Sequence, residues 1–130
     1  STGLARGVGR LLPQRAGRVE AKAIRVPGVN VSAIDLVVTL ARPATAAAIN
    51  ACMWHEGEAV YGSRLACSGD PHASIDFNHS AHSAIVDTSQ TRMSGERLAN
   101  LLVWFDNEWG FANRMVELAA VWKGRMGRGG

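Results

Sequence analysis

The sequence lacks the features that mark several large classes of protein. It has no run of about 18 apolar residues, so no transmembrane helix is predicted. The first ten residues are interrupted by Arg6 and by glycines, and they do not resemble a secretory signal. The two cysteines, Cys52 and Cys67, have neither a C-x-x-C spacing nor a disulfide framework around them. We therefore expect a protein of the reducing cytoplasm with no membrane partner.

The chain also lacks the common short motifs of catalytic and metal sites. It contains no G-x-G-x-x-G fingerprint, no phosphate-binding G-K-[ST] loop and no G-x-S-x-G elbow. A nucleophilic cysteine needs a base and a depressed pKa, and the surroundings of Cys52 and Cys67 suggest neither. Asp76, His79 and His82 have a spacing that suits a metal, but no fourth ligand is close in sequence. These histidines are better interpreted as surface or turn residues, and no metal is expected.

Length and charge restrict the remaining classes. The chain has 130 residues, of which 47% are hydrophobic, so it can bury one core and leaves little room for a second domain. The net charge is +3, with the basic excess at the two ends and a nearly balanced middle. A nucleic-acid binder tends to concentrate basic residues on one element among aromatics, so no nucleic-acid partner is expected. Small anionic ligands such as phosphate esters remain open.

Periodicity predicts an α+β fold, with a largely antiparallel sheet and helices packed on it. Helical spacing and capping residues predict helices over residues 4–12, 46–53 and 108–123, with Thr2 and Thr45 as N-caps of the first two. Alternating or β-branched residues predict strands over residues 19–26, 30–40, 74–77, 83–87 and 98–105. The first two strands are separated by a short Pro-Gly segment, so we expect them to pair antiparallel. Residues 124–130 are glycine-rich and are expected to form a flexible tail.

The stretch from Leu101 to Arg114 is the most informative part of the chain. It begins as a buried strand and ends as the start of a helix, and Asp106, Asn107 and Glu108 lie side by side between the two. Side-chain amides and backbone N–H groups at such junctions commonly hold ligands. One apolar face is predicted for the helix, formed by Phe111, Met115, Leu118 and Trp122. The first helix start, at Thr2, is a second candidate anion site, for which a plain helix cap is the alternative.

Several motifs, in their order and spacing, resemble the C-terminal part of the phosphorylating glyceraldehyde-3-phosphate dehydrogenase family. They are Thr2-Gly3 followed by L-A-R-G-V-G-R-L-L-P, the strand end Arg25-Val26-Pro27, N-V-S-A-I-D-L from residue 30, and W-F-D-N-E-W-G from residue 104. Within that family, four segments are most similar to the D-erythrose-4-phosphate dehydrogenases. These are D-F-N-H at 76–79, H-S-A-I-V-D at 82–87, Q-T-R at 90–92 and D-N-E-W-G-F-A-N-R-M at 106–115.

The resemblance implies a cytoplasmic, homotetrameric NAD enzyme that oxidises a phosphorylated aldehyde. In the family a cysteine thiolate attacks the aldehyde, a hydride passes to NAD and, in the erythrose-4-phosphate enzymes, the thioester is hydrolysed to 4-phosphoerythronate for pyridoxal 5′-phosphate synthesis. By the same resemblance, Thr2 and Gly3 bind a phosphate group at a helix start and Arg25 binds the substrate phosphate. Asn107 is implied to hold the nicotinamide carboxamide.

Some features of the family have no counterpart in this chain. The dinucleotide-binding domain, the catalytic cysteine of the C-T-T-N motif and the catalytic histidine all precede the matching part, so residues 1–130 are interpreted as a C-terminal catalytic-domain fragment that is inactive alone. Thr2-Gly3 is closer to the glyceraldehyde enzymes, and residues 53–67 match the family poorly. Three hypotheses follow: part of an erythrose-4-phosphate dehydrogenase, part of a glyceraldehyde-3-phosphate dehydrogenase, or an inactive truncated interaction module.

Overall fold

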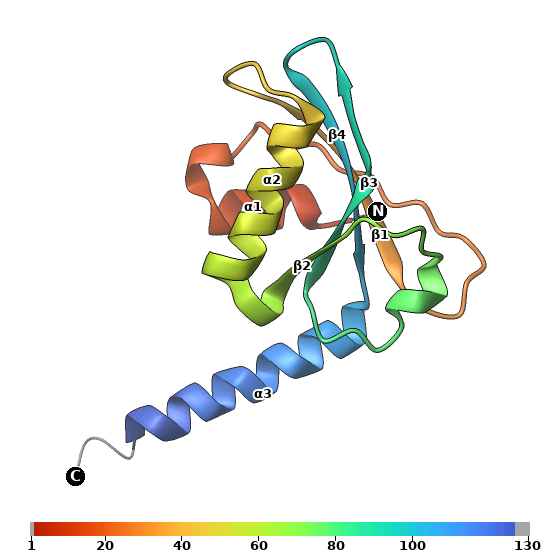
Figure 1. Ribbon diagram of the computed structural model, residues 1–130. Helices are drawn as coiled ribbons and strands as arrows, with labels where there is room; N and C mark the ends of the chain where they lie inside the picture. Colours follow the sequence, from red (N-terminus) through yellow and green to blue (C-terminus); the bar gives the residue numbers. More distant parts are fainter. Residues whose placement is uncertain (1, 127–130) are drawn as a thin grey trace.

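The fold is organised by a four-stranded sheet, seen in the computed structural model, which describes residues 2–126 (Figure 1). The strands are β1 (Ser32–Thr39), β2 (Leu65–Ser68), β3 (Ala84–Ser94) and β4 (Leu98–Phe105). Their order across the sheet is β1-β4-β3-β2. The central strand β4 pairs antiparallel with β1 and β3, whereas β2 pairs parallel with β3. The predicted α+β fold with a largely antiparallel sheet is thus confirmed.

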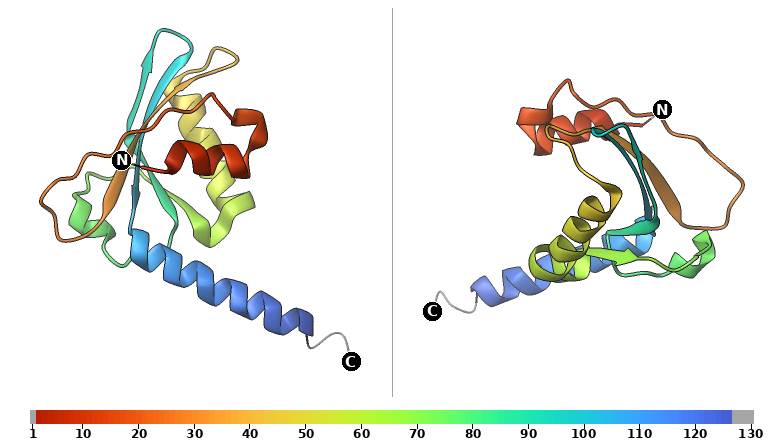
Figure 2. Two further views of the ribbon diagram at one scale, coloured as in Figure 1. Left: turned by 180° about the vertical axis from the view of Figure 1, so that it is seen from behind. Right: turned by 45° about the horizontal axis from the view of Figure 1, so that its top comes forward.

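Three helices and four shorter helical turns complete the described part of the chain. The helices are α1 (Leu4–Leu11), α2 (Ala46–Glu56) and α3 (Asn107–Met126). The turns are η1 (Pro13–Arg15), the π-helical η2 (Gly57–Tyr61), η3 (Gly62–Arg64) and η4 (Ser74–Phe77). Helices α1 and α2 lie on one side of the sheet, while η4 and residues 20–31 lie on the other (Figures 1 and 2). Helix α3 leaves the end of β4 and projects away from the sheet.

Within residues 2–126, no helix combines the length and the apolar character needed to cross a bilayer.

The core forms where α2 covers the sheet. Along β4, every second side chain is buried, namely Ala99, Leu101 and Val103, as expected for a strand with one face on the core. Ile49 and Met53 of α2 pack against this cluster. Hydrogen bonds also join α2 to the sheet. The side chain of Asn50 donates to the Thr88 carbonyl (2.9 Å) and accepts from the Thr91 hydroxyl (2.7 Å). On the opposite face, Phe77 of η4 stacks on Trp104 at a centroid distance of 5.5 Å.

Several elements lie where the sequence predicts them. Strand β4 has the predicted bounds, and α2 begins after Thr45, whose hydroxyl accepts from the Ala48 N–H at 3.1 Å. Helix α1 also forms and ends before Pro13. Its N-cap residue is Gly3 rather than Thr2, but the Thr2 hydroxyl accepts from the Leu4 N–H at 3.2 Å. The predicted helix start at residue 4 is therefore confirmed, and the cap residue differs from the prediction by one position.

The strand predicted over residues 19–26 does not form, and neither does its expected pairing with β1. Strand β1 is an edge strand, with β4 on one side and an open edge on the other. Pro27 has no N–H to donate, and the backbone at Val31 has φ = 69°, which redirects the chain immediately before β1. Segment 19–29 stays largely exposed, with Val26 at 75%, and among the described residues its backbone pairs with no strand.

Two further predictions need correction. Residues 74–77 form the 3₁₀ turn η4 and not a strand, because the Asp76 carboxylate accepts from the Ala73 N–H (2.8 Å) and closes a tight turn. Helix α3 begins one residue earlier than predicted and continues to Met126, so residues 124–126 are helical and not a flexible tail. The remainder of the predicted tail, residues 127–130, lies outside the described residues.

Gly110 is a point of close approach between α3 and the rest of the domain. It is buried, and a Cβ atom placed there would lie 3.2 Å from the His82 carbonyl oxygen, which belongs to the backbone. Gly124, near the other end of the same helix, faces open space. The two glycines therefore sit in the same element with opposite steric surroundings.

We predict opposite effects for Gly110→Ala and Gly124→Ala. The Gly124→Ala change should raise the free energy of unfolding by about 0.5–1 kcal/mol through helix propensity. The Gly110→Ala change should lower it by about 1–3 kcal/mol, because α3 and the His82 backbone must move apart. Urea unfolding of the two variants beside the wild type measures both effects, and equal stabilisation by both would contradict the close approach.

Candidate functional site

The junction of β4 and α3 presents an exposed amide on a rigid support. Asn107 is the first residue of α3, and its side chain is exposed. The preceding residue, Asp106, is only 1% exposed. Because α3 runs for 20 residues from this point, the first free backbone N–H groups and the positive end of the helix dipole lie beside the Asn107 amide. The junction thus offers donors and an acceptor to a polar ligand.

A single buried carboxylate fixes this junction. One oxygen of Asp106, Oδ1, accepts from the Trp109 N–H at 3.0 Å and so caps α3. The other, Oδ2, accepts from the Asn30 side-chain amide and from the His79 N–H, each at 2.8 Å. The same Asn30 amide nitrogen also donates to the Asn78 side-chain oxygen. Three segments far apart in the sequence therefore converge on one side chain.

The environment of Asp106 favours its charged form. Burial by itself would raise the pKa of this carboxyl group, but the backbone N–H groups of Trp109 and His79, followed by the Asn30 amide and the His79 charge, lower the pKa below its ordinary value. Hydrogen bonds donated to an ionised carboxylate are stronger than bonds between neutral groups. The carboxylate is therefore held as an anion that accepts at both oxygens.

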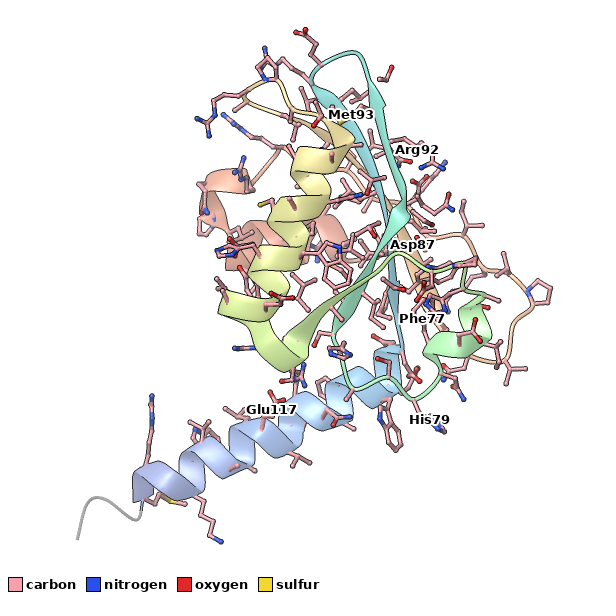
Figure 3. All side chains as sticks on the ribbon, viewed as in Figure 1. Phe77, His79, Asp87, Arg92, Met93 and Glu117 are labelled. Carbon is pink, nitrogen blue, oxygen red and sulfur yellow. The ribbon has the colours of Figure 1, made fainter. Side chains whose placement is uncertain are left out.

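Two strained backbone positions flank the donors to Asp106. Val31 (φ = 69°) follows Asn30, and His79 (φ = 59°) itself donates its N–H to Asp106. Among the described residues, these are the two non-glycine positions with positive φ. Such conformations cost about 1–3 kcal/mol each and persist where the surrounding structure over-determines them. The His79 ring also packs on the Trp109 ring at a centroid distance of 4.6 Å, and Figure 3 shows His79 beside the start of α3.

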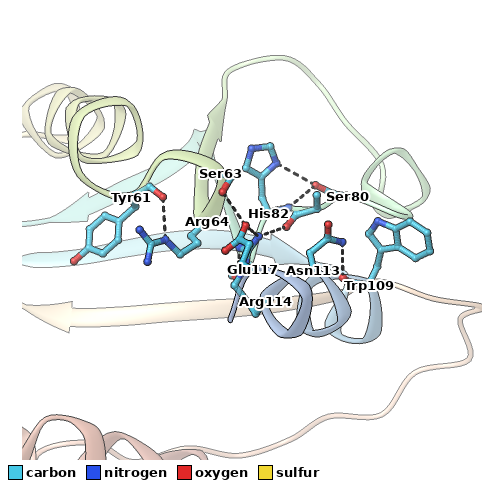
Figure 4. A network of polar contacts seen from close by, with 11 residues as sticks. Tyr61, Ser63, Arg64, Ser80, His82, Trp109, Asn113, Arg114 and Glu117 are labelled. Atoms are coloured by element: carbon cyan, nitrogen blue, oxygen red, sulfur yellow. Dashed lines mark hydrogen bonds and ion pairs between the residues drawn. The ribbon is translucent and has the colours of Figure 1, made fainter. Parts of the chain in front are cut away.

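A second set of contacts holds the beginning of α3 to the neighbouring turn. The Arg114 guanidinium donates to the Ser83 hydroxyl (3.0 Å) and the Ala81 carbonyl (3.2 Å), and it pairs with Glu117 at 2.7 Å (Figure 4). Glu117 in turn accepts from the Ser63 hydroxyl at 3.1 Å. Together with the Asp106 cap, these contacts fix the direction in which α3 leaves the sheet.

The other predicted site residues lie on separate segments. Thr2 and Gly3 precede α1, and Arg25 lies in the exposed segment between η1 and β1. Within residues 2–126, no hydrogen bond or ion pair joins Thr2, Arg25 or Asn107 to one another. Residues 20–31 lie on the side of the sheet away from α2 (Figures 1 and 2).

The candidate metal ligands have other partners. The Asp76 carboxylate pairs with His72 at 3.7 Å and closes η4, while the His79 ring lies on Trp109. His82 contacts the Ser80 hydroxyl at 3.3 Å. Among the described residues, no group of three His, Cys, Asp or Glu side chains is placed to hold a metal ion.

One pocket lies away from the junction and is lined by none of its residues. Its volume is about 330 Å³, and Trp54, Glu58 and Cys67 line it. Burial, and next the charge of Glu58, raise the pKa of the Cys67 thiol, which keeps the thiol protonated and a poor nucleophile. A second hollow of about 260 Å³ lies along α3 beside Trp109 and so adjoins the junction.

The architecture is that of an α+β domain whose site lies at a strand–helix junction, and not of a doubly wound parallel dinucleotide-binding domain. A family model described as "Glyceraldehyde 3-phosphate dehydrogenase, C-terminal domain" matches residues 1–107. The chain belongs to this family, whose members are oxidoreductases that use NAD in general. The match ends at Asn107, the first residue of α3.

The sequence motif singles out Asn107 as a candidate residue but gives no sign of the residues that hold its neighbour, Asp106. Asn30 lies 76 positions from Asp106, and His79 lies 27 positions away, so no local pattern connects them. One signal was available for Asp106 itself, because an aspartate directly before a helical pattern is a typical N-cap. That signal predicts the bond to Trp109 but not the two long-range bonds.

We predict that Asp106→Asn destabilises the protein in a pH-dependent way. A lowered folded-state pKa means that the carboxylate contributes stability above its unfolded value, about 3.9, and that this contribution is lost as the pH falls through the folded value. The free energy of unfolding should therefore drop by about 1–3 kcal/mol at pH 7. The difference from wild type should shrink below about pH 4.

Urea unfolding at pH 7 and at several values between about pH 2 and 5 measures this difference. The exposed Asp35, whose carboxylate accepts from Asn100, supplies the control. An Asp35→Asn change should alter stability at pH 7 by less than about 1 kcal/mol. If the difference in the free energy of unfolding between wild type and Asp106→Asn stays constant down to the lowest pH, an ionised Asp106 carboxylate is not the acceptor.

Proposed function

We propose that the chain is the C-terminal catalytic-domain part of an NAD-dependent D-erythrose-4-phosphate dehydrogenase. The reaction would oxidise the phosphorylated aldehyde to 4-phosphoerythronate for pyridoxal 5′-phosphate biosynthesis, in a cytoplasmic homotetramer. The observation that carries the proposal is the exposed Asn107 amide on a helix start that a buried carboxylate fixes. It coincides with the family match and with the motif D-N-E-W-G-F-A-N-R-M.

Asn107 fits the nicotinamide carboxamide of NAD. A carboxamide carries both a donor and an acceptor, and the Asn side chain presents the complementary pair. The proposed role of Asn107 is to orient the nicotinamide ring, and NAD when bound supplies the hydride acceptor. Orientation matters because a misplacement of about 1 Å can slow a reaction by about 100-fold. Asp106 supports this role, since its hydrogen bonds to Trp109 and His79 fix the backbone at the junction.

Thr2, Gly3 and Arg25 are proposed to bind phosphate. The start of α1 has free backbone N–H groups, and Gly3 leaves the approach to them open because nothing lies within 4 Å of a Cβ placed there. Arg25 is exposed in the segment before β1, so its guanidinium is free to bind phosphate oxygens in a bidentate manner. The catalytic cysteine and histidine of the family are proposed to lie outside this chain.

Glyceraldehyde 3-phosphate is the alternative substrate. The Thr2-Gly3 pair favours it, whereas the motifs at 76–79, 82–87 and 106–115 favour erythrose 4-phosphate. The two activities differ chemically, because the glyceraldehyde enzyme transfers the acyl group to inorganic phosphate and the erythrose enzyme transfers it to water.

We predict that Arg25→Ala and Asn107→Ala affect different substrates of the protein expressed from its complete gene. The Arg25→Ala change should lower kcat/KM for erythrose 4-phosphate by about 10–100-fold, as expected for loss of a charge-assisted contact. The Asn107→Ala change should raise the KM for NAD by about tenfold, because one pair of amide hydrogen bonds is lost. Steady-state kinetics with each substrate varied in turn measures both.

Matched controls are available beside each residue. Lys22→Ala removes a cation from the same exposed segment as Arg25, and Glu108→Gln changes the neighbour of Asn107; both should stay within about twofold of wild type. Turnover that requires inorganic phosphate and yields an acyl phosphate would replace the first hypothesis by the glyceraldehyde enzyme. Loss of activity in Lys22→Ala equal to that in Arg25→Ala would remove Arg25 from the site.

One observation favours the third hypothesis, an inactive interaction module. The predicted apolar face of α3 is exposed, with Phe111 at 66% and Trp122 at 62%. Together with Met115 it forms an apolar surface of the kind that marks interaction sites. The described residues of this chain do not cover it.

If residues 1–130 are produced alone, we predict that they associate or precipitate through this face. The replacement of Phe111 and Trp122 by Ser should reduce the association, whereas Val37→Ser on the exposed edge strand β1 should not. Light scattering over a range of concentrations measures the effect. A monodisperse, folded wild-type monomer would contradict it.

A further inference from the structure

We propose that Asp106 is a positioning residue that fixes two parts of the site, the segment that carries Arg25 and the helix start that carries Asn107. Through Asn30 it fixes the segment that carries Arg25, and through the start of α3 it fixes Asn107. The inference rests on the proposed function, because it concerns where the phosphate-binding and nicotinamide-binding side chains lie. Asp106 itself is buried and is not assigned a contact with substrate.

The Arg25 side depends on Asn30. Arg18 donates its N–H to the Arg15 carbonyl at 3.0 Å, and β1 pairing begins at Ser32. Between these points, among the described residues, the hydrogen bonds are those of the Asn30 side chain to Asp106 and Asn78. Arg25 lies five positions before Asn30, within about 17 Å of extended chain. The bond from Asn30 to Asp106 therefore restricts the volume that Arg25 can reach.

The Asn107 side depends on the other carboxylate oxygen. Asp106 Oδ1 caps α3 at the Trp109 N–H, and the Asp106 carbonyl accepts from the Gly110 N–H at 2.9 Å. Asn107 lies between the capping residue and the first hydrogen-bonded turn, so the cap determines the backbone from which its side chain projects. One side chain thus determines the relative positions of two segments that the sequence separates widely.

The hydrogen-bond pattern requires a carboxylate and not an amide. All three partners of the Asp106 side chain are N–H donors, and an ionised carboxylate accepts at both oxygens. An asparagine in the same place would direct an NH₂ group at one or two of these donors. The backbone conformations of Val31 and His79 strengthen the point, because both strained positions adjoin donors to Asp106.

The test separates the two sides kinetically in the protein expressed from its complete gene. The Asn30→Ala variant removes the bonds of the Arg25 segment to Asp106 and Asn78 and leaves both backbone bonds of Asp106 in place. The KM for erythrose 4-phosphate should therefore rise about tenfold while the dissociation constant of NAD stays within about twofold. The Asp106→Asn variant should raise both constants about tenfold. The double variant should be no worse for the aldehyde than Asp106→Asn alone, because Asn30 acts through Asp106.

Asp87→Asn is the matched control for a purely structural effect. Asp87 is also buried, at 4% exposure, and accepts from the Ser89 N–H and the Trp104 indole. This variant should lower the melting temperature and leave both constants within about twofold of wild type. If Asp106→Asn fails to fold, Asn30→Ala still decides the question, since it leaves both backbone bonds of Asp106 intact.

The outcomes distinguish this inference from the proposed function. Suppose that Asn30→Ala and Asp106→Asn have lowered melting temperatures but keep the KM for the aldehyde and the dissociation constant of NAD of the wild type. That result would overturn the positioning role and leave the proposed function standing. Absence of NAD-dependent oxidation of either aldehyde by the wild type would overturn the proposed function itself. A rise in the aldehyde KM that is confined to the Asn30 and Asp106 variants, with Asp87→Asn normal, supports the inference.

Discussion

The arrangement of the candidate site depends on one buried anion, the Asp106 carboxylate. An ionised carboxylate removed from water is strongly unfavourable unless donors replace its hydration. Asp106 obtains such donors from the start of α3, the turn at His79 and the side chain of Asn30. None of these donors could move away without leaving a buried charge partly unsatisfied. The hydrogen bonds that compensate for the lost hydration of Asp106 therefore also fix three connecting segments. Such segments are otherwise among the more mobile parts of a protein.

Stability and site geometry consequently have different sources in this domain. The apolar core lies between α2 and the sheet, where Leu101 and Val103 alternate with residues of the opposite face. The candidate site lies at one end of β4, beyond the apolar core, where hydrogen bonds to Asp106 hold the segments together. Strand β4 joins the core to the junction, so the core holds the end of β4 in place. Asp106 follows that end directly, and its hydrogen bonds hold Asn30 and His79 of the neighbouring loops against it.

The sequence predicts features that depend on residues close together in the chain, and it does not predict contacts between distant residues. Strand β4 was predictable because its alternation reports burial on one face, and α2 because Thr45 caps it locally. The segment 19–26 has the same alternation as a strand, but it pairs with no strand although the edge of β1 is open. Alternation does not report the turn at Val31, which directs the chain away from that edge. Asn107 is a candidate residue only through its motif, and its proposed role stays a prediction. The link from Asn30 to Asp106 spans 76 positions and leaves no local signature.

The direction of α3 is set by polar contacts and not by its apolar face. The hydrogen bonds between α3 and the rest of the described chain involve its first three turns, ending at Glu117, which accepts from Ser63. Beyond that residue the helix carries exposed apolar side chains, Trp122 among them. Since the Asp106 cap, the close approach of Gly110 and the Arg114 contacts all lie before that point, they suffice to orient the first turn. The position of Asn107 is therefore determined within this chain, whatever covers the far end of the helix.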